Sequence, residues 1–170
     1  NKVYNIPAVS LRLFNAYGTR SRTNSTYGAV MGVFFAQKLS NKPLTIVGSG
    51  NQKRDFIYIS DVVDAFILAS KKNVSGEVIN IGSGKPRTIK ELANLICSNK
   101  KNNLPKRPGE PDCTWANISK ANKLLGWKPK VQLEIGVNHL IKNISYWKNA
   151  PVWNRMSIKK ATKSWFKHLK

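Results

Sequence analysis

Short apolar runs, either β-branched or alternating with polar residues, recur along the first half of the chain, and turn-forming residues separate them. Runs of this kind are typical of buried strands. The predicted strands are Ala8–Leu13, Leu44–Val47, Phe56–Ile59 and Glu77–Ile81. We expect Asn15–Gly18 to end the first strand, and we expect the glycine pairs in Gly48–Gly50 and Gly82–Gly84 to form turns.

Apolar residues at helical spacing predict helices between these strands and in the rest of the chain. The predicted helices cover residues 28–39, 61–70, 89 to about 99, 119–125, 134–147 and 157–169. Ser60 is the expected N-cap of the second helix, and Thr88 with Glu91 forms the capping box of the third. The polar, proline-containing segment Lys100–Asp112 is predicted to be a long loop, of the kind that often carries function.

Strands and helices alternate as far as Asn99, and the later part is mostly helical. This order predicts an α/β fold with a parallel or mixed sheet. A length of 170 residues suits one domain, and 5 Trp, 5 Tyr and 6 Phe exclude a disordered polycation. No apolar run approaches the roughly 18 residues of a membrane span. Asn1–Pro7 carries no signal-peptide pattern, so we expect a soluble, cytoplasmic protein with no membrane partner.

Few residues have the types that hold metals or carry out acid–base chemistry. Cys97 and Cys113 are isolated from each other, and His139 and His168 fall in predicted helices, so we expect no metal site. Without an export signal, free thiols are the simpler interpretation of the two cysteines. No Ser/His/Asp order or carboxylate pair predicts a catalytic centre.

The charge is strongly unbalanced, with 29 Lys+Arg against 8 Asp+Glu and a formal net charge of +21. Between Ile135 and Lys170 there are 8 basic residues and no acidic one. A basic surface can bind nucleic acid through its phosphates, so a basic nucleic-acid-binding module without enzymatic activity is the alternative function. These lysines fall between core-type apolar positions and are not interleaved with stacking aromatics, which favours a solvated surface and no nucleic-acid partner.

Two polar residues lie where α/β folds bind ligands. Asn15 directly follows a predicted strand, and ligands bind outside the carboxyl ends of such strands. Its amide could donate to a phosphate or sugar oxygen, or could simply turn the chain. Arg54 lies between a glycine turn and the next strand, where its planar fork suits a phosphate. The alternative for Arg54 is an ion pair with Asp55 or with another surface acid.

Two further segments are weaker candidates. Arg107 and Glu110 lie in the predicted loop between prolines, and together they could bracket a phosphate and a sugar hydroxyl. The alternative is a solvated loop. Gly82–Gly84 follows a strand as a phosphate loop would, but Lys85 and Pro86 argue against a helix there, and we interpret the segment as a turn.

Several ordered segments together resemble the C-terminal half of the extended short-chain dehydrogenase/reductases. That family contains nucleotide-sugar 4-epimerases, 4,6-dehydratases and related decarboxylases. The matching segments are Leu11–Gly18 (LRLFNAYG), Pro43–Val63, Val78–Gly82, Arg107–Glu110 and Ser119–Pro129. Where the decarboxylases more often have Arg-Ala-Phe, this chain has Arg54-Asp-Phe56, which favours an epimerase or dehydratase.

The resemblance implies a fold and a division of labour. Family members hold NAD(P) on an N-terminal Rossmann domain and bind a nucleoside-diphosphate sugar with a smaller C-terminal domain. We therefore expect the C-terminal part of a Rossmann-type sheet plus a smaller, largely helical substrate-binding domain over residues 1–150, and a basic helical tail over 151–170. The Gly-rich cofactor loop and the catalytic Tyr-x-x-x-Lys pair are expected upstream of Asn1, which is not a Met.

The resemblance also assigns residues. Leu13 and Phe14 would lie near the nicotinamide, and Asn15 would contact the substrate diphosphate. The other substrate-binding residues implied are Ala29 and Val30 near the nucleotide, Thr45, Ile46 and Val47 along the base, Arg54 on phosphate, and Arg107 and Glu110 on phosphate and ribose. No catalytic residue is implied within this chain.

The function expected from this resemblance is the nucleotide-sugar-binding part of an NAD-dependent nucleotide-sugar 4-epimerase or 4,6-dehydratase. The substrate would be a UDP- or dTDP-sugar, and NAD would be bound mainly by the other half. We expect the full-length enzyme to be a homodimer and this chain alone to be inactive.

Overall fold

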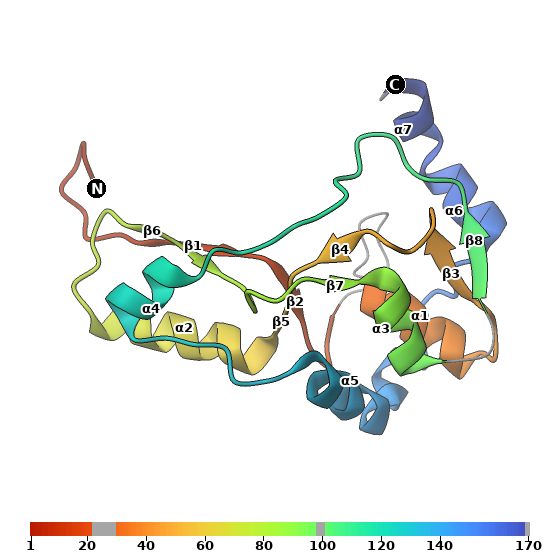
Figure 1. Ribbon diagram of the computed structural model, residues 1–170, viewed down its shortest axis with the longest axis horizontal. Helices are drawn as coiled ribbons and strands as arrows, with labels where there is room; N and C mark the ends of the chain where they lie inside the picture. Colours follow the sequence, from red (N-terminus) through yellow and green to blue (C-terminus); the bar gives the residue numbers. More distant parts are fainter. Residues whose placement is uncertain (22–29, 98–100, 169–170) are drawn as a thin grey trace.

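The structure is a computed structural model that describes residues 1–21, 30–97 and 101–168 (Figure 1). The strands are β1 (Ser10–Leu13), β2 (Asn15–Tyr17), β3 (Leu44–Val47), β4 (Lys53–Arg54), β5 (Phe56–Tyr58), β6 (Val78–Ile81), β7 (Arg87–Thr88) and β8 (Lys101–Leu104). The helices are α1 (Val30–Leu39), α2 (Ile59–Lys71), α3 (Ile89–Ile96), α4 (Ser119–Leu125), α5 (Leu133–Lys142), the 3-10 helix η1 (Ile144–Trp147), α6 (Arg155–Ala161) and α7 (Lys163–His168).

The strands associate in pairs, and most of these pairs are parallel. β1 pairs with β6, β2 with β5 and β3 with β8 in parallel, whereas β4 and β7 are antiparallel. Parallel neighbours need a crossover connection, usually a helix. Helix α2 lies on the connection from β1 to β6, and α3 lies on the connection from β3 to β8. The predicted α/β class with parallel strands is confirmed.

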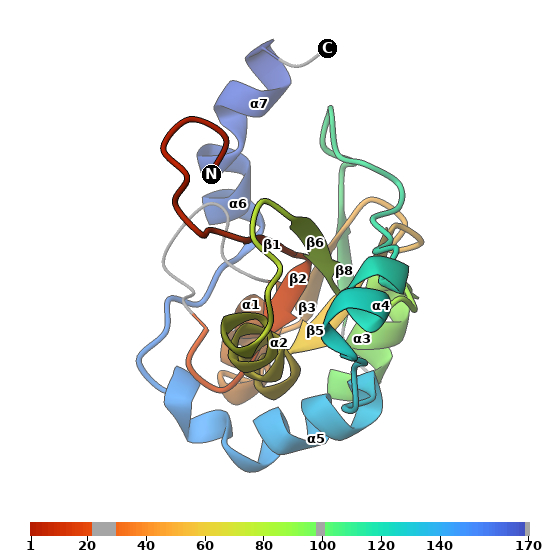
Figure 2. The same ribbon diagram turned by 90° about the vertical axis from the view of Figure 1, so that its left-hand side faces the viewer.

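Two hydrophobic cores follow one another along the long axis, on either side of β5 (Figure 1). One joins α1, α3, α5 and η1 to β3, and the other joins α2 and α4 to β6. Strand β5 contributes to both, because Phe56 belongs to the first core and Ile57 to the second. Successive side chains of a strand point to opposite faces, so one short strand holds the two cores together. Figure 2, viewed along this axis, shows β2 and β5 between α2 and the helices α3 and α5.

β1 ends at Leu13, directly before this segment, as predicted, but Asn15–Tyr17 form a second strand, which was not predicted. The chain changes partner there. The Phe14 N–H still bonds the Ile81 carbonyl beside β1 (2.9 Å), and the next N–H, of Asn15, bonds the Asp55 carbonyl (3.0 Å). The strand therefore continues as β2 against a different neighbour.

The predicted loop from Lys100 to Asp112 is also partly wrong, because β8 occupies its beginning. β8 has the sequence KNNL, and only Leu104 of it is buried. It is a strand because its main chain pairs in parallel with β3, and main-chain hydrogen bonds form whether the side chains are polar or apolar. Residues 98–100 lie outside the described residues, and with them the predicted helix end near Asn99; α3 ends at Ile96.

Helix ends follow the capping chemistry only in part. The Thr88–Glu91 capping box is confirmed, and the hydrogen bond from the Thr88 N–H lowers the pKa of Glu91. The Ser60 cap is wrong, since α2 already begins at Ile59. Two predicted helices are each divided: residues 134–147 at Asn143, and residues 157–169 at Thr162, after a start at Arg155 that Asn154 caps. None of the described helices is long and apolar enough to cross a bilayer.

Helix α5 approaches β2 so closely that only glycine fits at the contact. A Cβ on Gly136 would lie 2.1 Å from the Tyr17 hydroxyl oxygen. Tyr17 is 2% exposed, burial raises the pKa of its hydroxyl, and that hydroxyl has no hydrogen-bond partner among the residues the structure describes. A buried hydroxyl without a partner costs stability rather than adding it.

We therefore expect Tyr17→Phe to leave the free energy of unfolding unchanged or to raise it. Gly136→Ala should lower it by about 1–3 kcal/mol through overpacking, and by less when Tyr17→Phe has removed the nearest atom. Urea unfolding of the two single variants and the double variant measures this coupling. Equal costs of Gly136→Ala in both backgrounds would show that the Tyr17 hydroxyl does not set the spacing.

Candidate functional site

The candidate site is organised by the buried carboxylate of Asp55, which is 0% exposed. One oxygen accepts from the N–H and the hydroxyl of Ser83 (2.5 and 2.7 Å), and the other accepts from the N–H groups of Gly84 and Ala116 (both 3.0 Å). These donors replace the water that the charge loses on burial. The Gly82–Gly84 segment is thus a bend, as predicted, and its amides hold an internal carboxylate.

Glycine at position 82 makes this arrangement possible. A Cβ there would lie 2.5 Å from the Ala116 Cβ and 3.0 Å from an Asp55 carboxylate oxygen. The close approach brings the segment around Ala116 against the end of β6. As a result, the polar chain between β8 and α4 is fixed next to β4 and the end of β6, which both precede it in the sequence.

Thr114 connects this segment to Asn15. Its hydroxyl donates to Asn15 Oδ1 (3.2 Å) and accepts from the Asp55 N–H (3.4 Å). Its own N–H bonds the Lys53 carbonyl (3.1 Å). Because Asn15 uses its oxygen for this contact, its amide N–H groups stay available on an exposed side chain. The predicted phosphate-binding Asn therefore lies beside the strand that carries Arg54.

Arg54 is held in place by the loop that carries Glu110. Its Nη1 donates to the carbonyls of Lys53 and Pro111 (both 2.8 Å), and its Nη2 pairs with the Glu110 carboxylate at 2.9 Å. The sequence left open which acid could form an ion pair with Arg54. In the structure the partner is Glu110 and not Asp55. A guanidinium has five N–H donors, and these contacts within the described chain use three of them.

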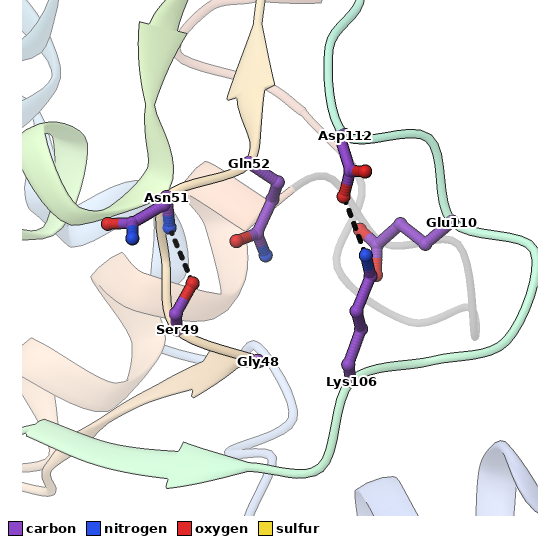
Figure 3. A pocket seen from close by; sticks show the side chains of 7 residues that line it. All are labelled: Gly48, Ser49, Asn51, Gln52, Lys106, Glu110 and Asp112. Carbon is purple, nitrogen blue, oxygen red and sulfur yellow. Dashed lines mark hydrogen bonds and ion pairs between the residues drawn. The ribbon is translucent and has the colours of Figure 1, made fainter.

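A polar crevice of about 180 Å³ lies beside Glu110, between the turn after β3 and the 106–112 loop (Figure 3). Figure 3 shows Lys106, Glu110 and Asp112 on the loop side, facing Ser49 and Gln52. Lys106 pairs with Asp112 at 2.6 Å, and this hydrogen bond lowers the pKa of Asp112. The crevice and the Arg54–Glu110 pair share one loop, so a ligand at either would contact the same segment.

Among the strands that the structure describes, β3 pairs with β8 alone, along one edge. The Gly48 N–H bonds the Leu104 carbonyl of the neighbouring chain segment (2.8 Å), so the alternation of a strand turns the main-chain groups of Thr45 and Val47 to the other edge. On that edge the Thr45 N–H bonds Gln37 Oε1 (3.1 Å) and the Val47 carbonyl accepts from Gln52 Nε2 (2.7 Å). Val47 also lines a cavity together with Arg107.

The remaining predicted residues are spread around this region. Leu13 and Phe14 follow one another at the carboxyl end of β1, where the Leu13 side chain is 44% exposed. Val30 is the first described residue of α1, and Ile46 is buried in the first core. Ala29 lies outside the described residues.

Comparison with known proteins identifies the family of this chain. Residues 1–82 match the model of the NAD dependent epimerase/dehydratase family. An uncharacterised UDP-glucose epimerase of Bacillus subtilis, YtcB, is 38% identical over 148 residues, which are 84% of this chain and 46% of that protein. The chain belongs to the NAD-dependent epimerase/dehydratase family. It spans about half the length of the curated relatives it matches.

Other members of the epimerase/dehydratase family are similar over the same part. UDP-glucuronic acid decarboxylase 1 of Danio rerio is 38% identical over 139 residues, 79% of this chain and 32% of that protein. The crystal structure of UDP-glucuronic acid 4-epimerase from Bacillus cereus with UDP-glucuronic acid and NAD is 40% identical and has a TM-score of 0.76. That comparison covers 87% of this chain and 47% of the epimerase chain.

Two residues that organise the candidate site, Asp55 and Thr114, are not predicted by the sequence patterns, which offer Asp55 only as an ion-pair partner of Arg54. An acidic residue inside an apolar stretch is a signal, because a buried charge needs donors. Nothing local indicates that those donors lie 28 to 61 residues further along the chain.

The Asp55 carboxylate generates a prediction. Asp55→Asn should lower the free energy of unfolding by about 3 kcal/mol, because an amide N–H₂ then faces N–H donors and a charge-assisted set is lost. The matched control is Asp112→Asn, since Asp112 is exposed and its ion pair in the described part of the chain is with exposed Lys106; its cost should stay below about 1 kcal/mol. Urea unfolding of both variants measures the two losses in unfolding free energy. Equal losses would contradict the interpretation that the buried Asp55 carboxylate organises the site.

Proposed function

We propose that this chain is the nucleotide-sugar-binding part of an NAD-dependent nucleotide-sugar 4-epimerase or 4,6-dehydratase, with a UDP- or dTDP-sugar as substrate. The observation that carries the proposal is that one segment, residues 110–114, contacts both predicted phosphate ligands. Glu110 and Pro111 bind the Arg54 guanidinium, and Thr114 binds Asn15, which lies two residues after the carboxyl end of β1. α/β folds bind ligands at such an end.

The chemistry of this cluster suits a diphosphate. The amide of Asn15 donates hydrogen bonds, and the two remaining N–H donors of Arg54 offer a positively charged contact. The guanidinium is already held by two carbonyls and a carboxylate, so little side-chain freedom is lost when a phosphate binds. Glu110 lies within the same loop as Arg107, where a carboxylate can accept from ribose hydroxyls.

The edge of β3 that faces away from β8 suits a pyrimidine base. Val47 N–H and Thr45 carbonyl face that edge, one a donor and the other an acceptor. The imide of uracil or thymine carries the complementary acceptor–donor pair, so a UDP- or dTDP-nucleotide can add to the edge as a further strand would. Relatives with known structures support this choice, since the Bacillus cereus epimerase was crystallised with UDP-glucuronic acid.

For NAD, we propose a contact at the end of β1. The exposed Leu13 side chain and Phe14, at the carboxyl end of an unpaired strand edge, offer an apolar surface that suits one face of a nicotinamide ring. Bound NAD would supply a hydride acceptor. Leu13 and Phe14 would position that ring, and Asn15 and Arg54 would hold the sugar nucleotide beside it. The acid–base residues would come from the half that this chain does not include.

The surface of the chain supports a complementary half. Strand β1 pairs with β6 on one edge, and no described strand covers its other edge. Helix α2 exposes an apolar row, in which each side chain is 44–52% exposed. The row consists of Ile59, Val63, Phe66 and Ile67. An open parallel edge beside an apolar helix face is what further strands and helices of a Rossmann-type sheet would cover. The homodimer and the cytoplasmic location stay predictions.

The first test is the contribution of Arg54 to binding. Arg54→Ala should weaken the affinity of the chain for UDP or dTDP ten- to more than a hundredfold, the value of a charge-assisted contact of roughly 1.5–3 kcal/mol. Arg54→Lys should weaken it less, because it keeps the charge and loses the fork. Calorimetric titration measures both, and Lys123→Ala, an exposed cation on α4, is the control. Parent-like binding by Arg54→Ala with an unchanged melting temperature would sink the assignment.

The second test is turnover. The chain has no Gly-rich dinucleotide loop after a strand at its start and none of its five tyrosines begins a Tyr-x-x-x-Lys pair. We expect it to convert neither UDP-glucose nor UDP-glucuronic acid when NAD is added, as followed by chromatography of the sugar nucleotides. A full-length relative assayed in parallel shows that the conditions support activity. Enzyme-dependent conversion by the purified chain would contradict the division of labour proposed here.

A further inference from the structure

The C-terminal segment forms a cavity with β3 and β8. Figure 1 shows α6 and α7 at the end of the molecule that holds these strands. The cavity has a volume of about 290 Å³. Its lining from the strand side is Val47, Leu104, Pro105 and Arg107, and from the C-terminal segment Arg155, Ile158, Lys159, Thr162, Lys163 and Phe166. Two of these, Val47 and Arg107, belong to the proposed nucleotide site.

The segment is attached to the strand along which the base is proposed to bind. Gln37 Nε2 donates to the Trp153 carbonyl (2.7 Å) and to Thr45 Oγ1 (2.7 Å), and Gln37 Oε1 accepts from the Thr45 N–H. Gln37 is fully buried. One side chain thus links the start of the segment to the edge of β3 that faces away from β8, so the position of α6 depends on the geometry of that edge.

The lining is positively charged and otherwise mostly apolar. It contains four cations and no carboxylate. Three of these cations, Arg155, Lys159 and Lys163, come from the C-terminal segment, where Asn154 caps α6 and Thr162 is 3% exposed. Cations around an apolar floor match a ligand with a flat apolar part and a strongly anionic part. A nucleoside diphosphate has both.

We propose that the C-terminal segment is the outer wall of the nucleotide site, and that Arg155, Lys159 and Lys163 bind the anionic part of the nucleoside diphosphate. This rests on the proposed function, because Val47 and Arg107 make the cavity continuous with the residues assigned to the base and the phosphates. The segment thereby raises affinity for the diphosphate form of the nucleotide relative to the uncharged nucleoside. Residues 151–168 therefore form part of the binding site.

The test is calorimetric titration of the chain with UDP and with uridine. Lys159→Gln/Lys163→Gln should weaken UDP binding about tenfold and change uridine binding less than twofold, since two partly exposed charges are lost from the anion's surroundings. Lys123→Gln/Lys128→Gln removes the same charge from α4 and the chain after it, and should change UDP binding less than twofold. Lys159→Arg/Lys163→Arg keeps the charge and should bind UDP like the parent.

The outcomes separate this proposal from the function it rests on. If the parent binds UDP and Arg54→Ala weakens it, but the Lys159/Lys163 glutamine pair behaves like the Lys123/Lys128 pair, the wall is wrong and the nucleotide site stands. If both glutamine pairs weaken UDP binding equally, the overall charge of the chain and not the position of the lysines sets the affinity. That result would also contradict the proposed role of the C-terminal segment. If the parent binds neither UDP nor dTDP, both proposals fail. Melting temperatures within a degree or so of the parent, expected for exposed lysines, certify the folded state of each variant.

Discussion

A carboxylate removed from water keeps its charge only if hydrogen-bond donors replace the solvent, and Asp55 obtains them from two distant segments. Three main-chain N–H groups and one hydroxyl converge on it, from the bend after β6 and from the chain before α4. Satisfying this charge fixes where both segments run. Arg54 precedes Asp55, and the loop that supplies Glu110 leads directly into the segment that Asp55 binds. The candidate site is therefore assembled by a requirement for solvation, and apolar packing adds to it.

The same strand joins the hydrophobic cores. Phe56 and Ile57 follow Asp55 and bury their side chains on opposite sides, one in each core. Three consecutive residues thus contribute to the buried hydrogen-bond network around Asp55 and to both hydrophobic cores. Displacement of β5 would disturb all of them together, so we expect the two cores on either side of this strand to unfold together.

The sequence predicts those features that depend on local chemistry. β3 is found over Leu44–Val47 as predicted because its residues are β-branched and a proline and glycines flank it. The Thr88–Glu91 box and the helix ended by Gly126, with φ +67°, depend on residues within a few positions of one another. The family segments predicted the α/β class and a set of site residues, of which Arg54 and Glu110 are in contact.

Features that depend on distant partners could not be predicted in this way. β8 is a polar strand that exists because β3 offers a free ladder, and β2 exists because β5 lies beside Asn15. The breaks at Asn143 and Thr162 lie inside patterns that are apolar at helical spacing, so periodicity gives no sign of them. The partners of Asp55 are main-chain amides, which every residue but proline carries, so no residue type identifies them.

The ion pair between Arg54 and Glu110 has a consequence for the thermodynamics of ligand capture. An open cation on a surface with net charge +21 is surrounded by mobile counter-ions, and an arriving phosphate displaces those ions into solution. Arg54 already has an anion fixed to the chain at 2.9 Å, with the two side chains only 11% and 21% exposed. In the proposed site a phosphate would meet the two N–H groups that these contacts leave over, on a cation whose nearest anion is fixed to the chain. Its binding at Arg54 would therefore release fewer mobile ions than binding at an open lysine of the same surface, and would depend less steeply on salt concentration.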